Sequence, residues 1–135
     1  MLTDNDILRI SHRIVEGCAP LVVGTFGSYG VGNPRPGSDL DVFVISNKGG
    51  DLGARVLAIK RLLFGILHPV DAFVFTPKEF EESAYEEQSF IWVIVKQARL
   101  YHWTEDAVSL VPSLAPKVLQ SGWPKVTPMN SGAQS

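Results

Sequence analysis

The hydrophobic positions of this chain follow a helical period first and a strand period next. Residues 4–16 carry isoleucine at three positions of helical spacing, which predicts an amphipathic helix that ends at Gly17. Residues 21–26 are apolar and rich in β-branched side chains, so they predict a strand that is buried on both faces.

A glycine-rich segment, residues 27–37, separates this strand from a second predicted strand over residues 39–45. The two-residue period of a strand places Asp39, Asp41 and Phe43 on one face. Two acidic side chains therefore stand directly after a stretch of polar, flexible residues, and apolar strands lie on both sides of that stretch.

A second helix is predicted over residues 51–63, with Asp51 as its N-terminal cap and Gly65 as its end. Its expected apolar stripe consists of Leu52, Val56, Ile59 and Leu63. The polar and basic side chains between these positions are expected to face solvent.

The remaining elements are a third strand, two helices and an extended segment. Residues 70–75 predict a strand with Asp71 near its start, and Thr76-Pro77 predicts the start of a short helix. Residues 89–97 are aromatic and β-branched enough for a strand, but their length and polar flanks favour a buried helix. We predict that helix, followed by an extended segment over residues 99–103.

This order of elements predicts an α/β (α+β) fold, a small mixed β-sheet flanked by helices. Prolines recur from about residue 104, and the last residues are small and polar. We therefore assign residues 1–103 to the main domain. Residues 104–135 form a C-terminal extension that we expect to be partly disordered, with a short helix over residues 108–119.

Composition and charge narrow the class of protein. A chain of 135 residues suits one domain, and its formal net charge of -2 lacks the basic surplus of a duplex-binding domain. Binding of duplex nucleic acid is therefore not expected. The chain starts without a signal-peptide pattern and has no apolar run near the roughly 20 residues of a membrane helix. The single cysteine, Cys18, fits a reducing compartment, so we expect a cytoplasmic protein.

The glycine-rich segment does not fit the two best-known phosphate-binding loops. Gly27 and Gly32 have the glycine spacing of the P-loop G-x-x-x-x-G-K-S/T, but Asn33 and Pro34 replace its lysine and hydroxyl residue. The order Gly27-x-x-Gly30-x-Gly32 reverses the dinucleotide-binding spacing. Backbone N–H groups of this segment remain able to bind phosphate in another arrangement.

The acidic residues suggest a metal site. Asp39 and Asp41 are about 7 Å apart along a strand, so they repel each other unless a cation or a proton lies between them. Carboxylate oxygens suit Mg²⁺ or Mn²⁺, and Asp71 joins them if the second and third strands are neighbours. The alternative is a turn and a solvated strand edge without chemistry.

These motifs resemble a known family. Gly27-Ser28, Gly32 and Ser38-Asp39-Leu40-Asp41 resemble the G-S…G…S-D-x-D signature of the DNA polymerase β-like nucleotidyltransferases. The similarity is greatest to the minimal nucleotidyltransferases, or MNT domains. Residues 70–80 resemble the third-carboxylate strand of those proteins and the helix that follows it, and the resemblance covers roughly residues 5–103.

The resemblance implies a reaction and the residues that perform it. Gly27 and Ser28, with Gly32 in the same segment and Ser38 directly after it, would bind the phosphates of ATP or another nucleoside triphosphate. Asp39, Asp41 and Asp71 would hold Mg²⁺ or Mn²⁺ and form the catalytic site. An acceptor hydroxyl would then attack the α-phosphorus, and pyrophosphate would leave.

The resemblance also implies partners. MNT proteins are often paired with a helical HEPN-domain protein in toxin–antitoxin modules, which makes a HEPN-type partner the expected acceptor of AMP. The acceptor would be brought by that partner or by an oligomer. The alternative is a weak or inactive MNT protein that acts by binding its partner, because Val31 stands where many minimal members carry arginine.

Overall fold

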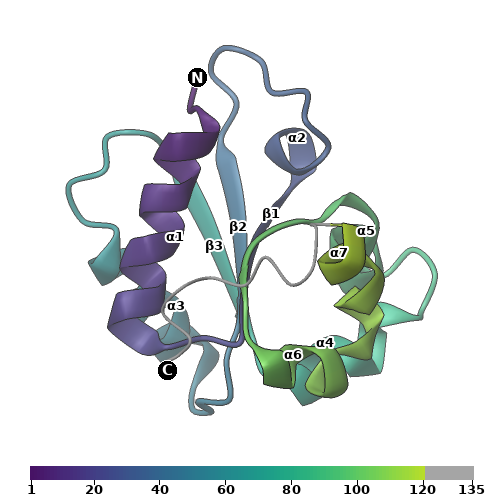
Figure 1. Ribbon diagram of the computed structural model, residues 1–135. Coiled ribbons are helices and arrows are strands. Elements are labelled where there is room, and N and C mark those ends of the chain that lie inside the picture. The colour runs from purple at the N-terminus through teal and green to yellow at the C-terminus, as the bar shows by residue number, and fades with distance from the viewer. Residues whose placement is uncertain (121–135) are drawn as a thin grey trace.

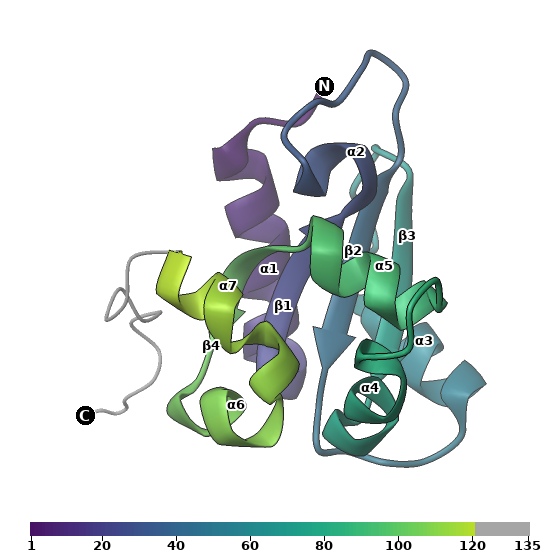
Figure 2. The same ribbon diagram turned by 90° about the vertical axis from the view of Figure 1, so that its right-hand side faces the viewer.

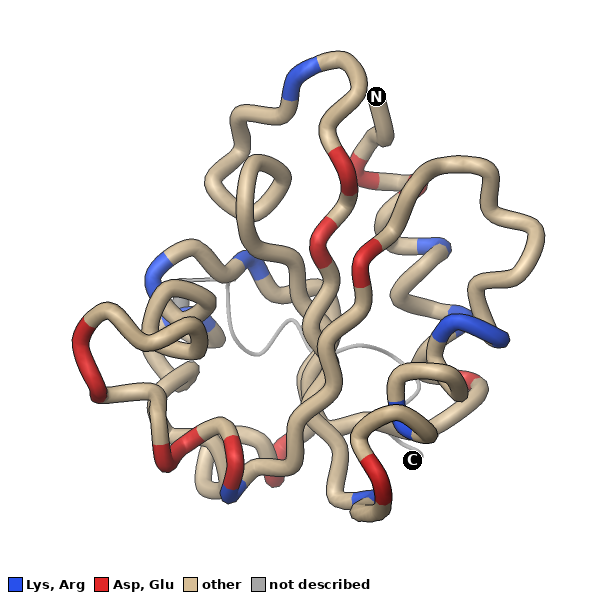
Figure 3. Tube along the Cα trace, turned by 180° about the vertical axis from the view of Figure 1, so that it is seen from behind, with Lys and Arg blue, Asp and Glu red and all other residues tan. Residues whose placement is uncertain are grey.

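The computed structural model describes residues 1–120, in which a four-stranded sheet lies between two layers of helices (Figure 1). The strands are β1 (Val22–Phe26), β2 (Leu40–Ile45), β3 (Val70–Phe75) and β4 (Arg99–Trp103), in the order β3-β2-β1-β4. Strand β1 is antiparallel to β2 and β4, whereas β2 is parallel to β3. The predicted small mixed sheet is therefore confirmed. Figure 3 shows the chain from behind, with acidic positions near the same end of neighbouring strands.

The helices divide between the two faces of the sheet (Figures 1 and 2). One face packs against α1 (Asp4–Cys18) and α3 (Leu52–Leu62). The other face packs against α4 (Pro77–Ala84), α5 (Phe90–Gln97), α6 (Glu105–Leu110), the 3-10 turn Pro112–Leu114 and α7 (Ala115–Gln120). Strand β1 is buried along its whole length, as its apolar sequence predicted. No helix of the described residues is long and apolar enough to cross a membrane.

Helix α1 extends beyond its predicted end. A capping box between Thr3 and Asp6 starts it, and it ends at Cys18, with the cap residue Ala19 in a left-handed conformation with φ of 46°. Gly17 lies inside the helix, so its prediction as the end was wrong. A Cβ atom at Gly17 would lie 2.3 Å from the Leu62 side chain. This glycine allows α1 to approach α3 closely.

Helix α3 starts as predicted but buries fewer residues than predicted. The Asp51 side chain accepts a hydrogen bond from the Ala54 N–H at 3.2 Å. Ile59 and Leu63 are buried, but Leu52 is 56% exposed, so its place in the apolar stripe was wrong. The burial pattern shows that the first turn of α3 lies beyond the core.

Residues 90–97 form the predicted helix, and the predicted extended segment over residues 99–103 is strand β4. Ser89 caps α5 by accepting a hydrogen bond from the Trp92 N–H at 3.0 Å. Ile91 and Ile94, three residues apart, point into the core. Helical spacing therefore outweighs the β-branched content of this segment, because it buries one continuous face.

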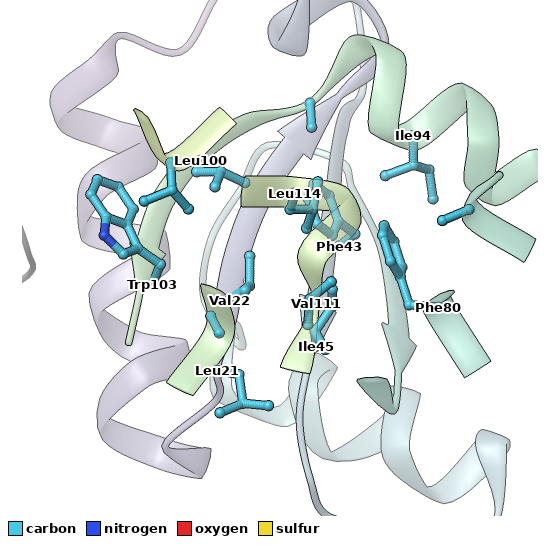
Figure 4. Packing of buried hydrophobic residues seen from close by; sticks show 14 of the residues in the cluster. Leu21, Val22, Phe43, Ile45, Phe80, Ile94, Leu100, Trp103, Val111 and Leu114 are labelled. Atoms are coloured by element: carbon cyan, nitrogen blue, oxygen red, sulfur yellow. The ribbon is translucent and has the colours of Figure 1, made fainter. Parts of the chain in front are cut away.

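Residues 105–120 add to the core beside β4. Ala107, Val111, Leu114 and Val118 are buried in the same hydrophobic cluster as the sheet (Figure 4). The predicted single helix is instead α6, a 3-10 turn and α7, because Pro112 cannot continue a helix. The division at residue 103 stays a prediction, and the predicted disorder of the chain end lies outside the described residues.

An ion pair joins the helices on opposite faces of the sheet. Arg55 of α3 donates two hydrogen bonds to the Glu79 carboxylate of α4, at 2.9 and 3.1 Å. Glu79 also accepts a hydrogen bond from the Thr76 N–H, which completes a capping box. The Arg55 hydrogen bonds and the Thr76 N–H lower the pKa of Glu79 to about 2.

We expect this pair to make stability depend on pH in acid. The folded pKa of Glu79 lies below its ordinary value of 4.5, so its contribution is complete above pH 4.5 and is lost as the pH falls toward 2. Glu79→Gln should lower the free energy of unfolding by about 1 kcal/mol or less at pH 7, since the Glu79 side chain is 46% exposed. The deficit should shrink at pH 3, measured by urea unfolding. Glu82→Gln is the control, and an equal deficit at both pH values would contradict the assignment.

Candidate active site

Three acidic residues lie at one end of β2 and β3. Asp41 and Asp71 are directly opposite each other in the parallel pairing of these strands. Asp39 lies two residues before Asp41, just outside β2. Asp41 is half-buried, and the other two are exposed. The structure therefore places Asp41 and Asp71 side by side on neighbouring strands, as the sequence predicted if the strands were neighbours. Figure 3 shows acidic positions close together at this end of the sheet.

The charges at this end of the sheet are not balanced. Partial burial, with smaller effects from Asp71 and then Asp39, raises the pKa of Asp41. A cation would relieve this repulsion, and carboxylate oxygens are suitable ligands for Mg²⁺ or Mn²⁺. In the side-chain positions seen, no three acidic, histidine or cysteine residues among the described ones lie close enough to hold a metal ion. The donor chemistry thus fits a divalent ion, while convergence of all three carboxylates is not seen.

The glycine-rich segment starts with a single helical turn, α2 (Gly27–Gly30), rather than with an irregular loop. Its first residue, Gly27, has φ of 68°. A Cβ atom at Gly27 would lie 2.5 Å from Oδ2 of Asp41. Both the backbone conformation and the space therefore require glycine here, and the turn starts in contact with the Asp41 carboxylate.

Hydrogen bonds with distant parts of the chain hold this turn. The Gly27 N–H donates a hydrogen bond to Oε1 of Gln97 at 2.9 Å. The Tyr29 ring is buried, and its hydroxyl accepts a hydrogen bond from the Leu2 N–H at 3.0 Å. Sequence reasoning missed Gln97, because a partner 70 residues away leaves no local pattern.

Of the remaining predicted site residues, Ser28 lies in α2, and Gly32 and Ser38 lie in the loop between α2 and β2. The Ser28 carbonyl accepts a hydrogen bond from the Asn33 N–H at 2.9 Å, which closes the first part of this loop. Gly32 has φ of 81°, a conformation that favours glycine. Val31 is 58% exposed, so it has no role in the core.

Ser38 shapes the end of the loop. Its hydroxyl accepts a hydrogen bond from the Arg35 N–H at 3.0 Å. Its carbonyl is 2.9 Å from Nε2 of His68, whose ring meets the Tyr29 ring edge-on. Ser38 therefore lies beside Asp39, and the polar groups of Ser38 already form hydrogen bonds that hold the loop. Arg35 is exposed.

The sequence matches a family model described as "Nucleotidyltransferase domain" over residues 12–119. This match extends past residue 103, where the recognised resemblance ended, and includes α6 and most of α7. A comparison with curated proteins found no match.

Several solved structures have the same fold. A crystal structure of a toxin–antitoxin with AMP-PNP has a TM-score of 0.54 and 18% identity, over 89% of this chain and 87% of that chain. A putative nucleotidyltransferase from Sulfolobus solfataricus has a TM-score of 0.53 and 22% identity, over 73% and 78% of the two chains. A mutant of the toxin–antitoxin MntA-HpeT has a TM-score of 0.52 and 17% identity, over 89% and 87%. At these identities the similarity establishes the fold alone.

The comparisons agree with the topology. The mixed four-stranded sheet with helices on both faces is the polymerase β-like nucleotidyltransferase fold. The family match covers most of the chain and contains the glycine turn and all three carboxylates. This chain belongs to the nucleotidyltransferase domain family of enzymes.

Proposed function

We propose that this protein transfers AMP from ATP to a hydroxyl group of a partner protein, with pyrophosphate as the leaving group. The observation that supports the proposal most directly is the in-register pair Asp41 and Asp71, with Gly27 in contact with Asp41. This arrangement puts candidate metal ligands and a candidate phosphate-binding turn at one end of the sheet. Such a combination suits phosphoryl-transfer chemistry, which depends on positioning and on neutralising charge.

The site residues divide into two groups in the proposed reaction, one for the metal ion and one for the triphosphate. Asp39, Asp41 and Asp71 would hold Mg²⁺ or Mn²⁺, which would supply positive charge to offset the charge of the triphosphate. Gly27 and Ser28 of the turn, with Gly32 and Ser38 of the loop that follows it, bind and orient the triphosphate. The Asp41 carboxylate must be ionised to act as a ligand, although its pKa is raised by burial and by its two acidic neighbours.

Solved structures of the same fold support the choice of substrates. The toxin–antitoxin structure of the same fold contains AMP-PNP, an ATP analogue, which supports ATP as the nucleotide. Two of the similar structures are toxin–antitoxin assemblies, which supports a protein as the acceptor. Together with the resemblance to MNT domains, this favours a HEPN-type toxin as the partner.

A second function is favoured by one observation. Val31, in the glycine-rich segment, has an exposed side chain. It is an apolar residue at a position where the resemblance leads us to expect arginine. A site without that cation binds triphosphate less tightly. In this alternative the protein acts by binding its partner and transfers AMP slowly or not at all.

The test is incubation with α-labelled ATP, Mg²⁺ and any small helical protein encoded beside this one. We expect label on the partner, no label from γ-labelled ATP, and no transfer by Asp39→Ala. ATP with Mg²⁺ should also raise the melting temperature of the wild type but not that of Asp39→Ala. Equal labelling of the partner by the wild type and by Asp39→Ala would refute the mechanism. A stable complex with the partner that carries no label would favour the binding function.

A further inference from the structure

We propose that Gln97 is a positioning residue that sets the geometry of the glycine turn against the acidic site. The inference rests on the proposed function, because it assigns Gln97 a role in binding the triphosphate. Gln97 is the last residue of α5, directly before the cap Ala98 and strand β4. It reaches the turn from the helix layer on the opposite side of the sheet from α1 (Figure 2).

Gln97 holds both ends of the turn. Its side-chain Oε1 accepts the Gly27 N–H at 2.9 Å. Its backbone carbonyl lies so close to Gly30 that a Cβ atom there would be 2.4 Å from the carbonyl oxygen. One residue therefore contacts the first and the last residue of α2, and this fixes how the turn is rotated relative to β1.

The rotation of the turn determines where Gly27 lies relative to Asp41. Gly27 keeps a left-handed backbone, with φ of 68°, and has no room for a Cβ beside Oδ2 of Asp41. The Gly27 N–H is satisfied in this conformation by the hydrogen bond that it donates to Oε1 of Gln97. The amide of Gln97 thus acts on the site through Gly27 and has no need to touch the substrate.

A neutral amide suits this position. Asp41 lies opposite Asp71, and Asp39 lies two residues before Asp41, so acidic side chains already gather at this end of the sheet. A carboxylate at position 97 would accept the same hydrogen bond but would add another negative charge near the expected triphosphate. Glutamine supplies the acceptor without the charge.

The experiment compares the wild type with Gln97→Met, Gln97→Glu and Lys96→Met. Methionine keeps the length and helix-forming tendency of glutamine but lacks a strong acceptor, whereas glutamate keeps the acceptor. Lys96→Met makes the same new residue one position earlier, with its side chain exposed. Three quantities are measured: exchange of the Gly27 amide by NMR, the Kd of ATP with Mg²⁺ by calorimetry, and kcat and KM for AMP transfer.

Gln97→Met should speed exchange of the Gly27 amide and raise the Kd and KM for ATP by about fivefold to tenfold, the loss expected for one hydrogen bond. Its kcat should stay within about twofold, because the interaction is the same in ground and transition states. Gln97→Glu should keep the slow exchange of the Gly27 amide, and Lys96→Met should match the wild type. A general loss of packing would not separate methionine from glutamate in this way.

The outcomes separate this inference from the proposed function. Unchanged Gly27 exchange or unchanged ATP affinity in Gln97→Met overturns the role of Gln97, whether or not the wild type transfers AMP. A wild type that binds ATP with Gln97-dependent affinity but transfers no AMP contradicts the proposed transfer alone and supports the positioning role. A wild type that binds no ATP overturns both.

Discussion

Asp41→Asn is expected to reduce AMP transfer by about a thousandfold or more while it raises the melting temperature of the nucleotide-free protein. The loss of activity follows because an amide is a poor ligand for the ion that neutralises the phosphates. The gain in stability follows from the raised pKa of Asp41, whose charged form is disfavoured by burial and by Asp71 and Asp39. Asparagine has nearly the same shape and carries no charge.

The sign of this stability effect can be checked by titration. A carboxyl group whose folded pKa is raised destabilises the fold when it is charged. The melting temperature of the wild type should therefore approach that of Asp41→Asn as the pH falls through the pKa of Asp41. Thermal melts at pH 7 and pH 4, with the transfer assay at pH 7, make the comparison. Asp51→Asn is the matched control, because asparagine caps α3 as well as aspartate does. Retained transfer, or a lower melting temperature at pH 7, would contradict the placement of Asp41.

Phe43→Ala is expected to lower the free energy of unfolding by about 3–5 kcal/mol. Phe43 is 0% exposed, and its ring stacks on Phe80 with a centroid distance of 5.9 Å (Figure 4). Gly24 leaves room for this ring, because a Cβ there would lie 2.7 Å from it. Removal of the ring would leave a cavity between β1, β2 and α4. A loss of this size is a large part of the roughly 5–15 kcal/mol that stabilises a domain.

Urea unfolding at pH 7 measures the effect. Phe64→Ala is the control, since Phe64 is 87% exposed and its loss should change stability by about 0.5 kcal/mol or less. A decrease of less than about 1 kcal/mol for Phe43→Ala would mean that the core can close over the missing ring.

Local patterns predicted the elements that carry their own signals. Thr76 caps the helix that follows it, as the sequence indicated. The apolar run around Asp71 forms β3 over the predicted residues 70–75. The same reasoning was wrong at Gly17 and Leu52, because their environments depend on a neighbouring helix or on the extent of the core. A glycine that ends a helix and a glycine that admits another helix look alike in sequence.

The candidate site also combines features that the sequence predicts with features that depend on tertiary contacts. The chemical groups follow from the sequence: a glycine-rich turn, two carboxylates on one strand face and a third on another strand, each recognisable from spacing and residue type. Their geometry depends on contacts between distant segments. The parallel pairing of β2 and β3 places Asp41 opposite Asp71, and the return of α5 beside β1 brings Gln97 to Gly27. Neither contact leaves a periodic trace, because both arise from the order of strands in the sheet and from the packing of helices on it.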